Sequence, residues 1–190
     1  MERGKSDWQN LHQDLIDKCR KGDKQAQFEI YRLYYKSMYN VSLRIVNETQ
    51  EAEDIMQDSF LSAFENIGSY RGKVSFGAWL RRIVINRSID ALKKRKNLLT
   101  GIEEVEDMPD LSDSGNSDYE ETRLEVERIQ KCISLLPDGY RIILSLYLLE
   151  GYDHEEIALI LGISASTSRS QYTRARHKLA VLLKKDRRDG

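Results

Sequence analysis

The chain has 190 residues, of which 40% are apolar and 32% charged, and its formal net charge is −1. It contains no run of about 18 apolar residues, so the sequence predicts no membrane span, and its first ten residues lack the apolar core of a secretory signal. We therefore expect a cytoplasmic protein. Cys19 and Cys132 are far apart in the sequence and belong to no Cys/His cluster. The sequence therefore predicts no metal, no cofactor and no disulfide framework.

Charge is divided unevenly along the chain. Residues 1–99 hold 18 Lys and Arg against 13 Asp and Glu, residues 100–130 hold 2 against 11, and residues 131–190 hold 10 against 7. Two basic segments thus flank an acidic one. This arrangement is typical of proteins that bind nucleic acid through basic surfaces joined by an acidic, solvated connector.

The first predicted element is a long helix that includes residues 28–45, because apolar residues recur there at spacings of three and four. Its mostly apolar face comprises Phe28, Tyr31, Tyr35, Met38, Ser42 and Ile45.

A second helix is expected from Thr49, which can cap it, and its first turn is acidic, as the positive end of a helix dipole favours. Its predicted buried face comprises Ala52, Ile55, Met56, Phe60, Ala63, Phe64 and Ile67. This face leaves Asp54, Gln57, Asp58 and Leu61 partly or wholly outside.

A glycine-containing loop, residues 66–75, leads into a third helix of about six turns. The loop and the helix start interleave aromatic and basic residues, a combination suited to stacking on unpaired bases and neutralising phosphates. Along the helix, Trp79, Leu80, Ile83, Val84 and Ala91 are expected to pack on one side, and the other side carries Arg81, Arg82, Asn86, Lys93, Lys94 and Lys96. The alternative is that Phe76 and Trp79 are core residues and the basic residues are a solvated helix end.

Residues 98–118 are predicted to form a flexible linker. They are acidic, contain Pro, Gly, Ser and Asn, and their apolar residues follow no period, so they have little surface to bury.

The last segment carries a sharper pattern. Asp153 and Glu156 form a capping box before a short helix, Gly162 ends that helix, and Ser164 can cap a second helix running to about residue 183. This is the spacing of a helix-turn-helix, whose second helix can enter the DNA major groove. Its inner face holds Ser168, Tyr172, Ala175, Leu179 and Leu182, and its outer face holds Ser166, Arg169, Ser170, Thr173, Arg174 and Arg176. The alternative is a helical hairpin with a charged outer face.

Residues 52–60, 76–90 and 136–164, with RARHKL at 174–179, resemble the signature segments of the extracytoplasmic-function sigma factors, in the same order. The resemblance implies an all-α protein with two helical domains joined by a flexible acidic linker, the C-terminal domain being a helix-turn-helix. We assign residues 1–97 to sigma region 2, 98–118 to the linker and 119–190 to sigma region 4.

The resemblance also implies function. Such a protein is not an enzyme but binds core RNA polymerase and directs promoter-specific initiation by reading duplex minus-35 and melted minus-10 DNA. An anti-sigma factor is a further partner that the resemblance suggests. It implies that Asp54, Gln57, Asp58 and Phe60 contact core polymerase. It assigns minus-10 DNA to Ser69, Tyr70, Lys73, Phe76, Arg82, Asn86, Arg87, Lys93 and Lys94. It assigns minus-35 DNA to Ser166, Thr167, Arg169, Ser170, Gln171, Thr173, Arg174 and Arg176.

Two residues depart from the family pattern, which usually has Val at the position of Ser168 and a basic residue at that of Gln171. The hydroxyl of Ser168 needs a partner, and we expect a backbone carbonyl one turn back. Gln171 removes or alters a DNA contact, so the minus-35 preference cannot be transferred from other members.

Two other classes of function remain open at this stage. Glu51, Asp54 and Asp58 could hold a divalent metal in a nuclease, although no His converges on them in the sequence. A helix-turn-helix regulator acting without polymerase would account for residues 120–184 and leave the N-terminal segment without a role.

Overall fold

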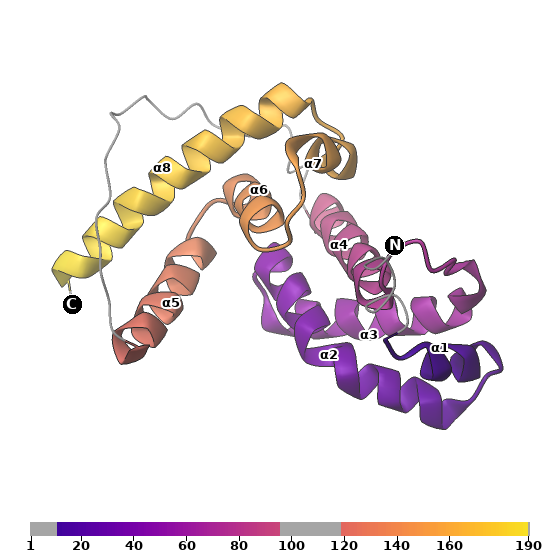
Figure 1. The fold of residues 1–190 in the computed structure, drawn as a ribbon. Coiled ribbons are helices and arrows are strands. Elements are labelled where there is room, and N and C mark those ends of the chain that lie inside the picture. Colours follow the sequence, from indigo (N-terminus) through magenta and orange to yellow (C-terminus); the bar gives the residue numbers. More distant parts are fainter. Residues whose placement is uncertain (1–10, 96–118, 190) are drawn as a thin grey trace, which may run out of the picture. The chain divides into compact units, whose positions relative to one another are not determined.

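The computed structural model describes residues 11–95 and 119–189, and every regular element in these ranges is a helix. The expected all-α class is confirmed. The chain divides into two units, Met1–Lys94 and Arg95–Gly190 (Figure 1). The linker predicted at 98–118 lies outside the described residues. Within the described ranges, none of the helices combines the length and apolar character needed to cross a membrane.

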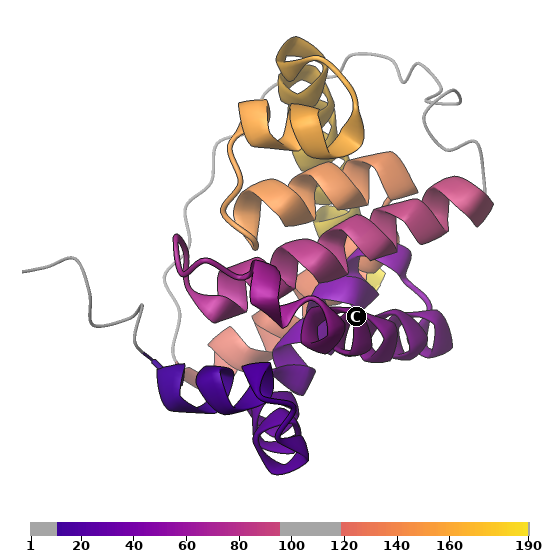
Figure 2. The ribbon, with the colours of Figure 1, turned by 90° about the vertical axis from the view of Figure 1, so that its right-hand side faces the viewer.

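The first unit is built around a pair of long helices. The elements are α1 (Gln13–Arg20), α2 (Lys24–Val46), α3 (Thr49–Glu65), the 3-10 turn η1 (Ile67–Ser69) and α4 (Phe76–Arg95). Helix α2 packs against α1 and α3. Helix α4 lies beside α2, as Figures 1 and 2 show, and the two are joined by a buried hydrogen bond between Ser42 Oγ and Ser88 Oγ at 3.0 Å. The Ser88 hydroxyl also bonds the Val84 carbonyl oxygen at 2.8 Å.

Side chains cap both long helices. Asp23 accepts hydrogen bonds from the backbone N–H of Gln25 and Ala26 before α2. Glu48, rather than the predicted Thr49, caps α3, since its carboxylate accepts from the backbone N–H groups of the first turn. A carboxylate at this position also suits the positive end of the helix dipole.

The buried face of α4 is rotated from the predicted one. Leu80 and Val84 are buried as expected, whereas Trp79, Ile83 and Ala91 are only half-buried. The remaining buried residues of α4 are Phe76, Ile85, Ser88, Ile89 and Leu92. This rotation leaves Arg82, Asn86, Lys93 and Lys94 exposed on the opposite side.

The second unit consists of α5 (Tyr119–Ser134), α6 (Asp138–Leu148), α7 (His154–Leu161) and α8 (Ala165–Asp189). The long helix α8 packs against the other three (Figure 1). A core of buried residues joins α5, α6 and α8, with Leu179 and Leu182 packed against it. Its members are Ile133, Leu136, Tyr140, Leu144 and Ala175.

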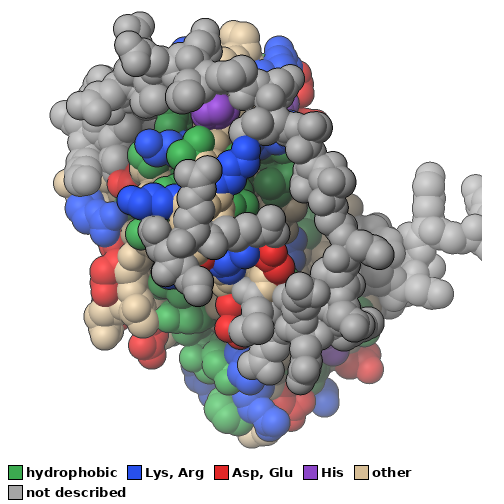
Figure 3. All heavy atoms as spheres, turned by 90° about the vertical axis from the view of Figure 1, so that its left-hand side faces the viewer, with side chains coloured by type: hydrophobic (Ala, Val, Ile, Leu, Met, Phe, Trp, Pro, Cys, Tyr) green, Lys and Arg blue, Asp and Glu red, His purple; other side chains and the backbone are tan. Residues whose placement is uncertain are grey.

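Several large apolar side chains remain at the surface. Phe28, predicted to lie on the buried face of α2, is 55% exposed, and Leu61 on α3 is 61% exposed. Figure 3 shows one face of the molecule, where apolar side chains lie among charged side chains of both signs. Phe28 and Leu61 line the same groove, and exposed apolar side chains that lie together frequently mark contact surfaces.

Candidate nucleic-acid and partner interfaces

The exposed side of α3 is acidic and polar. Asp54, Gln57 and Asp58 are all exposed, as the sequence predicts. Gln57 donates a hydrogen bond to Glu53 at 3.3 Å, and Asp54 accepts one from Gln50 at the same distance. These contacts join residues four apart on one helix, so the face remains open to a partner.

Phe60 does not lie on that exposed face. It is 2% exposed, and its ring packs against Tyr31 with the ring centroids 5.0 Å apart. Its ring belongs to the core between α2 and α3, as the helical periodicity predicts, and the polymerase contact that the family resemblance implies for Phe60 stays a prediction.

Phe60 also forms part of the wall of a groove of about 420 Å³ between α2 and α3. Helical periodicity does not predict this groove, because the exposure of Phe28 depends on how α2 packs. The groove is lined by Lys24, Gln27, Phe28, Tyr31, Gln57, Phe60, Leu61 and Phe64.

The loop before α4 is held by Tyr70. The Tyr70 hydroxyl donates to the Val74 carbonyl oxygen at 2.8 Å, and the Tyr70 carbonyl oxygen accepts from Arg20 of α1 at 2.8 Å. The Tyr70 ring lies against Phe76 and Trp79, with centroids 5.5 and 5.4 Å away. Burial raises the pKa of Tyr70, and the positive charge of Arg20 opposes that rise.

This packing corrects the predicted stacking of bases on Tyr70 or Phe76. Both side chains are almost fully buried, at 2% and 3% exposure, so neither ring offers a free face in this conformation. The alternative reading of Phe76 as a core residue is the one that fits. Ser69 and Lys73 of the same loop are exposed, and a hollow of about 440 Å³ beside them is lined by Arg20, Gly68, Tyr70 and Arg71.

Helix α4 presents the predicted polar residues on one side of the first unit. Arg82, Asn86, Lys93 and Lys94 are exposed, and Arg87 is half-buried. The face therefore combines several cations with an amide, the groups that contact phosphates and base edges.

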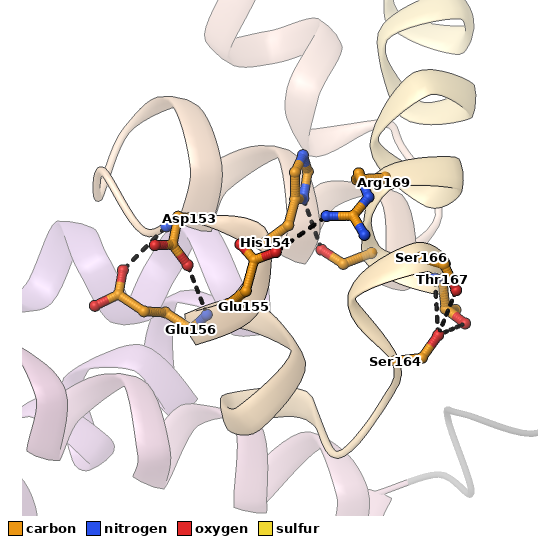
Figure 4. Close-up of polar contacts among 9 residues, drawn as sticks. Asp153, His154, Glu155, Glu156, Ser164, Ser166, Thr167 and Arg169 are labelled. Carbon is orange, nitrogen blue, oxygen red and sulfur yellow. Dashed lines mark hydrogen bonds and ion pairs between the residues drawn. The ribbon is translucent and has the colours of Figure 1, made fainter.

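The predicted helix-turn-helix is present as α7, a short turn and α8 (Figure 4). Asp153 and Glu156 form the expected capping box, with each side chain accepting from the other residue's backbone N–H. Gly162 ends α7 in the left-handed conformation, with φ of 74°. Ser164 accepts from the backbone N–H of Thr167 at 3.0 Å and so caps α8.

The outer face of α8 carries most of the predicted minus-35 residues. Ser166, Arg169, Ser170, Thr173, Arg174 and Arg176 are all exposed. Thr167 is half-buried, and its hydroxyl lies 2.8 Å from that of Ser164 in the capped first turn. Arg176 lies over the ring of Tyr172, with its guanidinium carbon 5.9 Å from the centroid.

Gln171 does not share this face. It is 6% exposed, and its Oε1 has no hydrogen-bond partner within the described part of the protein. The expectation that Gln171 contacts DNA is therefore corrected, because residue 171 lies on the inner side of α8 between Ser168 and Ala175, both of them fully buried.

Ser168 has a partner other than the predicted one. Its hydroxyl lies 2.9 Å from Nδ1 of His154, the first residue of α7, rather than against a carbonyl of its own helix. The residues lie 14 apart in sequence, so helical periodicity carries no signal for this contact.

Among the described residues, no group of three or more His, Cys, Asp or Glu is arranged to hold a metal ion. Two helical units, one with a basic helix beside a polar loop and one with a helix-turn-helix, together define the architecture of a DNA-binding protein.

Comparison with known proteins specifies the family. The family described as Sigma-70 region 2 matches residues 30–98, and Sigma-70, region 4 matches residues 126–179. The RNA polymerase sigma-H factor of Pseudomonas aeruginosa is 30% identical over 90% of this chain and 93% of its own length. The ECF RNA polymerase sigma factor SigW of Bacillus subtilis is 31% identical over 89% of this chain and 95% of its own.

Solved structures agree on the fold. CnrH, in complex with the cytosolic domain of CnrY, aligns with a TM-score of 0.54 and 23% identity over 90% of this chain and 96% of that one. The sigma factor RpoE of Bartonella quintana, in complex with the anti-sigma factor NepR, aligns with a TM-score of 0.54 and 24% identity over 82% of this chain and 95% of that one.

The chain belongs to the extracytoplasmic-function sigma factors of the sigma-70 family. It therefore binds core RNA polymerase and directs promoter-specific initiation at minus-35 and minus-10 elements. Sigma factors are initiation factors without enzymatic activity.

Proposed function

We propose that each surface described above serves one step of initiation. The exposed residues Asp54, Gln57 and Asp58 of α3 dock on core polymerase. The neighbouring groove supports this assignment, because Gln57 lines it together with the exposed apolar side chains of Phe28 and Leu61. An apolar groove beside an acidic and amide face provides both buried area and orientation for one protein partner.

The minus-10 strand is contacted by the exposed part of the loop and by α4. Ser69 and Lys73 supply the loop contacts, whereas Tyr70 and Phe76 shape the loop from within the core. The helix contributes Arg82, Asn86, Arg87, Lys93 and Lys94. Cations along one face provide phosphate contacts, and an exposed amide offers a donor and an acceptor to an unpaired base.

The minus-35 duplex is read by the outer face of α8. The exposure of Arg169, Ser170, Thr173 and Arg174 on the second helix of a helix-turn-helix is the observation that carries the proposal. Arginine can bond guanine in two places, and hydroxyls bond base edges or phosphates. Ser166 and Arg176 extend this face at either end, and Thr167 contributes through the cap.

Initiation then depends on binding energy rather than bond chemistry. We assign residues 1–97 to docking and minus-10 recognition, 98–118 to the linker, and 119–190 to minus-35 recognition. Each module alone binds its promoter element weakly. When both modules are docked on polymerase, binding of one element makes binding of the other effectively intramolecular. The factor acts in the cytoplasm, where its polymerase partner works, and has no catalytic activity of its own.

We also propose an anti-sigma factor as a partner. The two solved structures named above were obtained with CnrY and with the anti-sigma factor NepR, respectively. The exposed apolar side chains of Phe28 and Leu61 supply a surface on which such a protein would exclude polymerase.

A pull-down of core polymerase with the full chain tests the docking assignment, with Asp58→Lys and Gln57→Ala as variants. Reduced retention of polymerase by folded variants supports it, and unchanged retention refutes it. Capture of no polymerase by the wild-type chain would instead favour a regulator acting alone.

A further inference from the structure

The first turn of α7 and the first turns of α8 are joined by two successive contacts, each between residues 14 apart. His154 meets Ser168, and the next residue on each helix forms an ion pair, in which Arg169 Nη1 donates to Glu155 Oε1 at 3.1 Å (Figure 4). The two contacts therefore link the two helices of the helix-turn-helix side by side, one partly buried (the inner contact) and one exposed (the outer contact).

The inner contact, between His154 and Ser168, is fixed by packing. Ser168 is fully buried, and the His154 ring stacks on Tyr147 of α6 with centroids 4.6 Å apart. Tyr172 of α8 closes the cluster, 4.5 Å from Tyr147 and 5.6 Å from His154 by ring centroids. Three helices thus meet at this cluster, which sets the separation of the helix starts.

The outer contact, the ion pair between Glu155 and Arg169, lies at the surface. The side chains of Arg169 and Glu155 are 55% and 67% exposed. The two other acids at the start of α7, Asp153 and Glu156, are engaged in the capping box. Glu155 is thus the acid of this turn that faces a cation of the proposed DNA-reading surface.

We propose that Glu155 is a specificity-determining residue for minus-35 recognition, acting through Arg169. The carboxylate offsets the charge that Arg169 would present to any phosphate, so DNA without the correct bases gains little from this arginine. A guanidinium has five N–H donors, and the ion pair occupies Nη1. Donors therefore remain for a base edge at a matched site, where Arg169 can keep its carboxylate contact and read sequence.

This inference rests on the proposed role of α8, and the test separates the two. Holoenzyme assembled with the full chain is measured on two promoter fragments, one with the preferred minus-35 element and one with that element scrambled. Glu155→Gln is expected to raise the affinity for the scrambled fragment about two- to five-fold, which corresponds to the free energy of an exposed ion pair. The affinity for the fragment with the preferred element should rise less. The salt dependence of binding should steepen by about one phosphate contact.

Glu127→Gln is the matched control, since it makes the same charge change on α5. That helix contacts the far end of α8, through Lys131 and Asp186 at 3.2 Å. This variant should leave the ratio of the two affinities unchanged. In an Arg169→Ala background, Glu155→Gln should lose its effect on that ratio.

Each outcome is decisive. If Arg169→Ala weakens matched binding and Glu155→Gln leaves both the ratio and the salt slope unchanged, the inference is wrong and the role of α8 stands. If Glu155→Gln lowers the ratio equally with and without Arg169, the carboxylate acts by another route and the inference also fails. If Arg169→Ala changes neither affinity, the assignment of Arg169 to minus-35 DNA fails, and with it the inference.

Discussion

Tyr70→Ala should destabilise the first unit, because Tyr70 is a core residue. The substitution removes a side chain that is 2% exposed, its ring contacts with Phe76 and Trp79, and the hydrogen bond to Val74. Truncating a buried aromatic side chain costs about 3–5 kcal/mol. Tyr70→Phe removes only the hydroxyl and should cost about 0.5–1.5 kcal/mol.

Guanidinium denaturation followed by tryptophan fluorescence measures these effects. The second unit contains no tryptophan in its sequence, and Trp79 packs against Tyr70 in the first unit, so the signal of Trp79 reports that unit. With a slope of about 4 kcal/mol per molar denaturant, Tyr70→Ala should lower the midpoint by about 1 M.

The half-exposed Phe28 provides the control. Phe28→Ala should change the free energy of unfolding by less than about 1 kcal/mol, since surface substitutions have small effects. A Tyr70→Ala midpoint equal to that of the wild type would contradict the buried position of the ring. If the midpoint falls as expected, a promoter-melting defect of the Tyr70→Ala variant is explained by the lost loop structure rather than by lost stacking on a base.

Further predictions concern other residues. Gln171→Leu should leave minus-35 protection intact. Because the substitution removes a buried acceptor that lacks a partner, the free energy of unfolding should stay the same or rise by about 1–3 kcal/mol. A loss of the minus-35 footprint would place Gln171 on the DNA-contacting face. Asp58→Lys should weaken core polymerase binding at least several-fold in a titration without lowering the midpoint of unfolding, and equal affinity would exclude the α3 face. Burial raises the pKa of both Cys19 and Cys132, so little thiolate is present at pH 8. Thiol reagents should therefore label the native chain much more slowly than the unfolded chain. Equal labelling rates would place the thiols at the surface.

The helix-turn-helix could be predicted from sequence because its signals are local. Asp153, Glu156, Gly162 and Ser164 each act within one turn of their own position, and all four act as expected. The exposed acids of α3 follow from helical periodicity for the same reason.

Burial in the loop and on the inner side of α8 could not be predicted in this way. Tyr70 is buried against Phe76 and Trp79 of α4, Phe76 packs on Tyr34 of α2, and Arg20 of α1 reaches the loop from 50 residues away. The partner of Ser168 is likewise supplied by another helix. Contacts between elements decide these positions, and a single sequence carries no pattern for them.

The central claim is that one chain carries two modules that read separate promoter elements while both are held by polymerase. Footprinting of holoenzyme on one promoter, with wild-type chain and with Arg174→Ala, tests it most directly. A lost minus-35 phosphate or base contact should cost about 1–3 kcal/mol, so upstream protection should weaken while permanganate-reactive bases persist in the minus-10 region. Full upstream protection by the Arg174→Ala holoenzyme, or no protection of either element by the wild-type holoenzyme, would contradict the account.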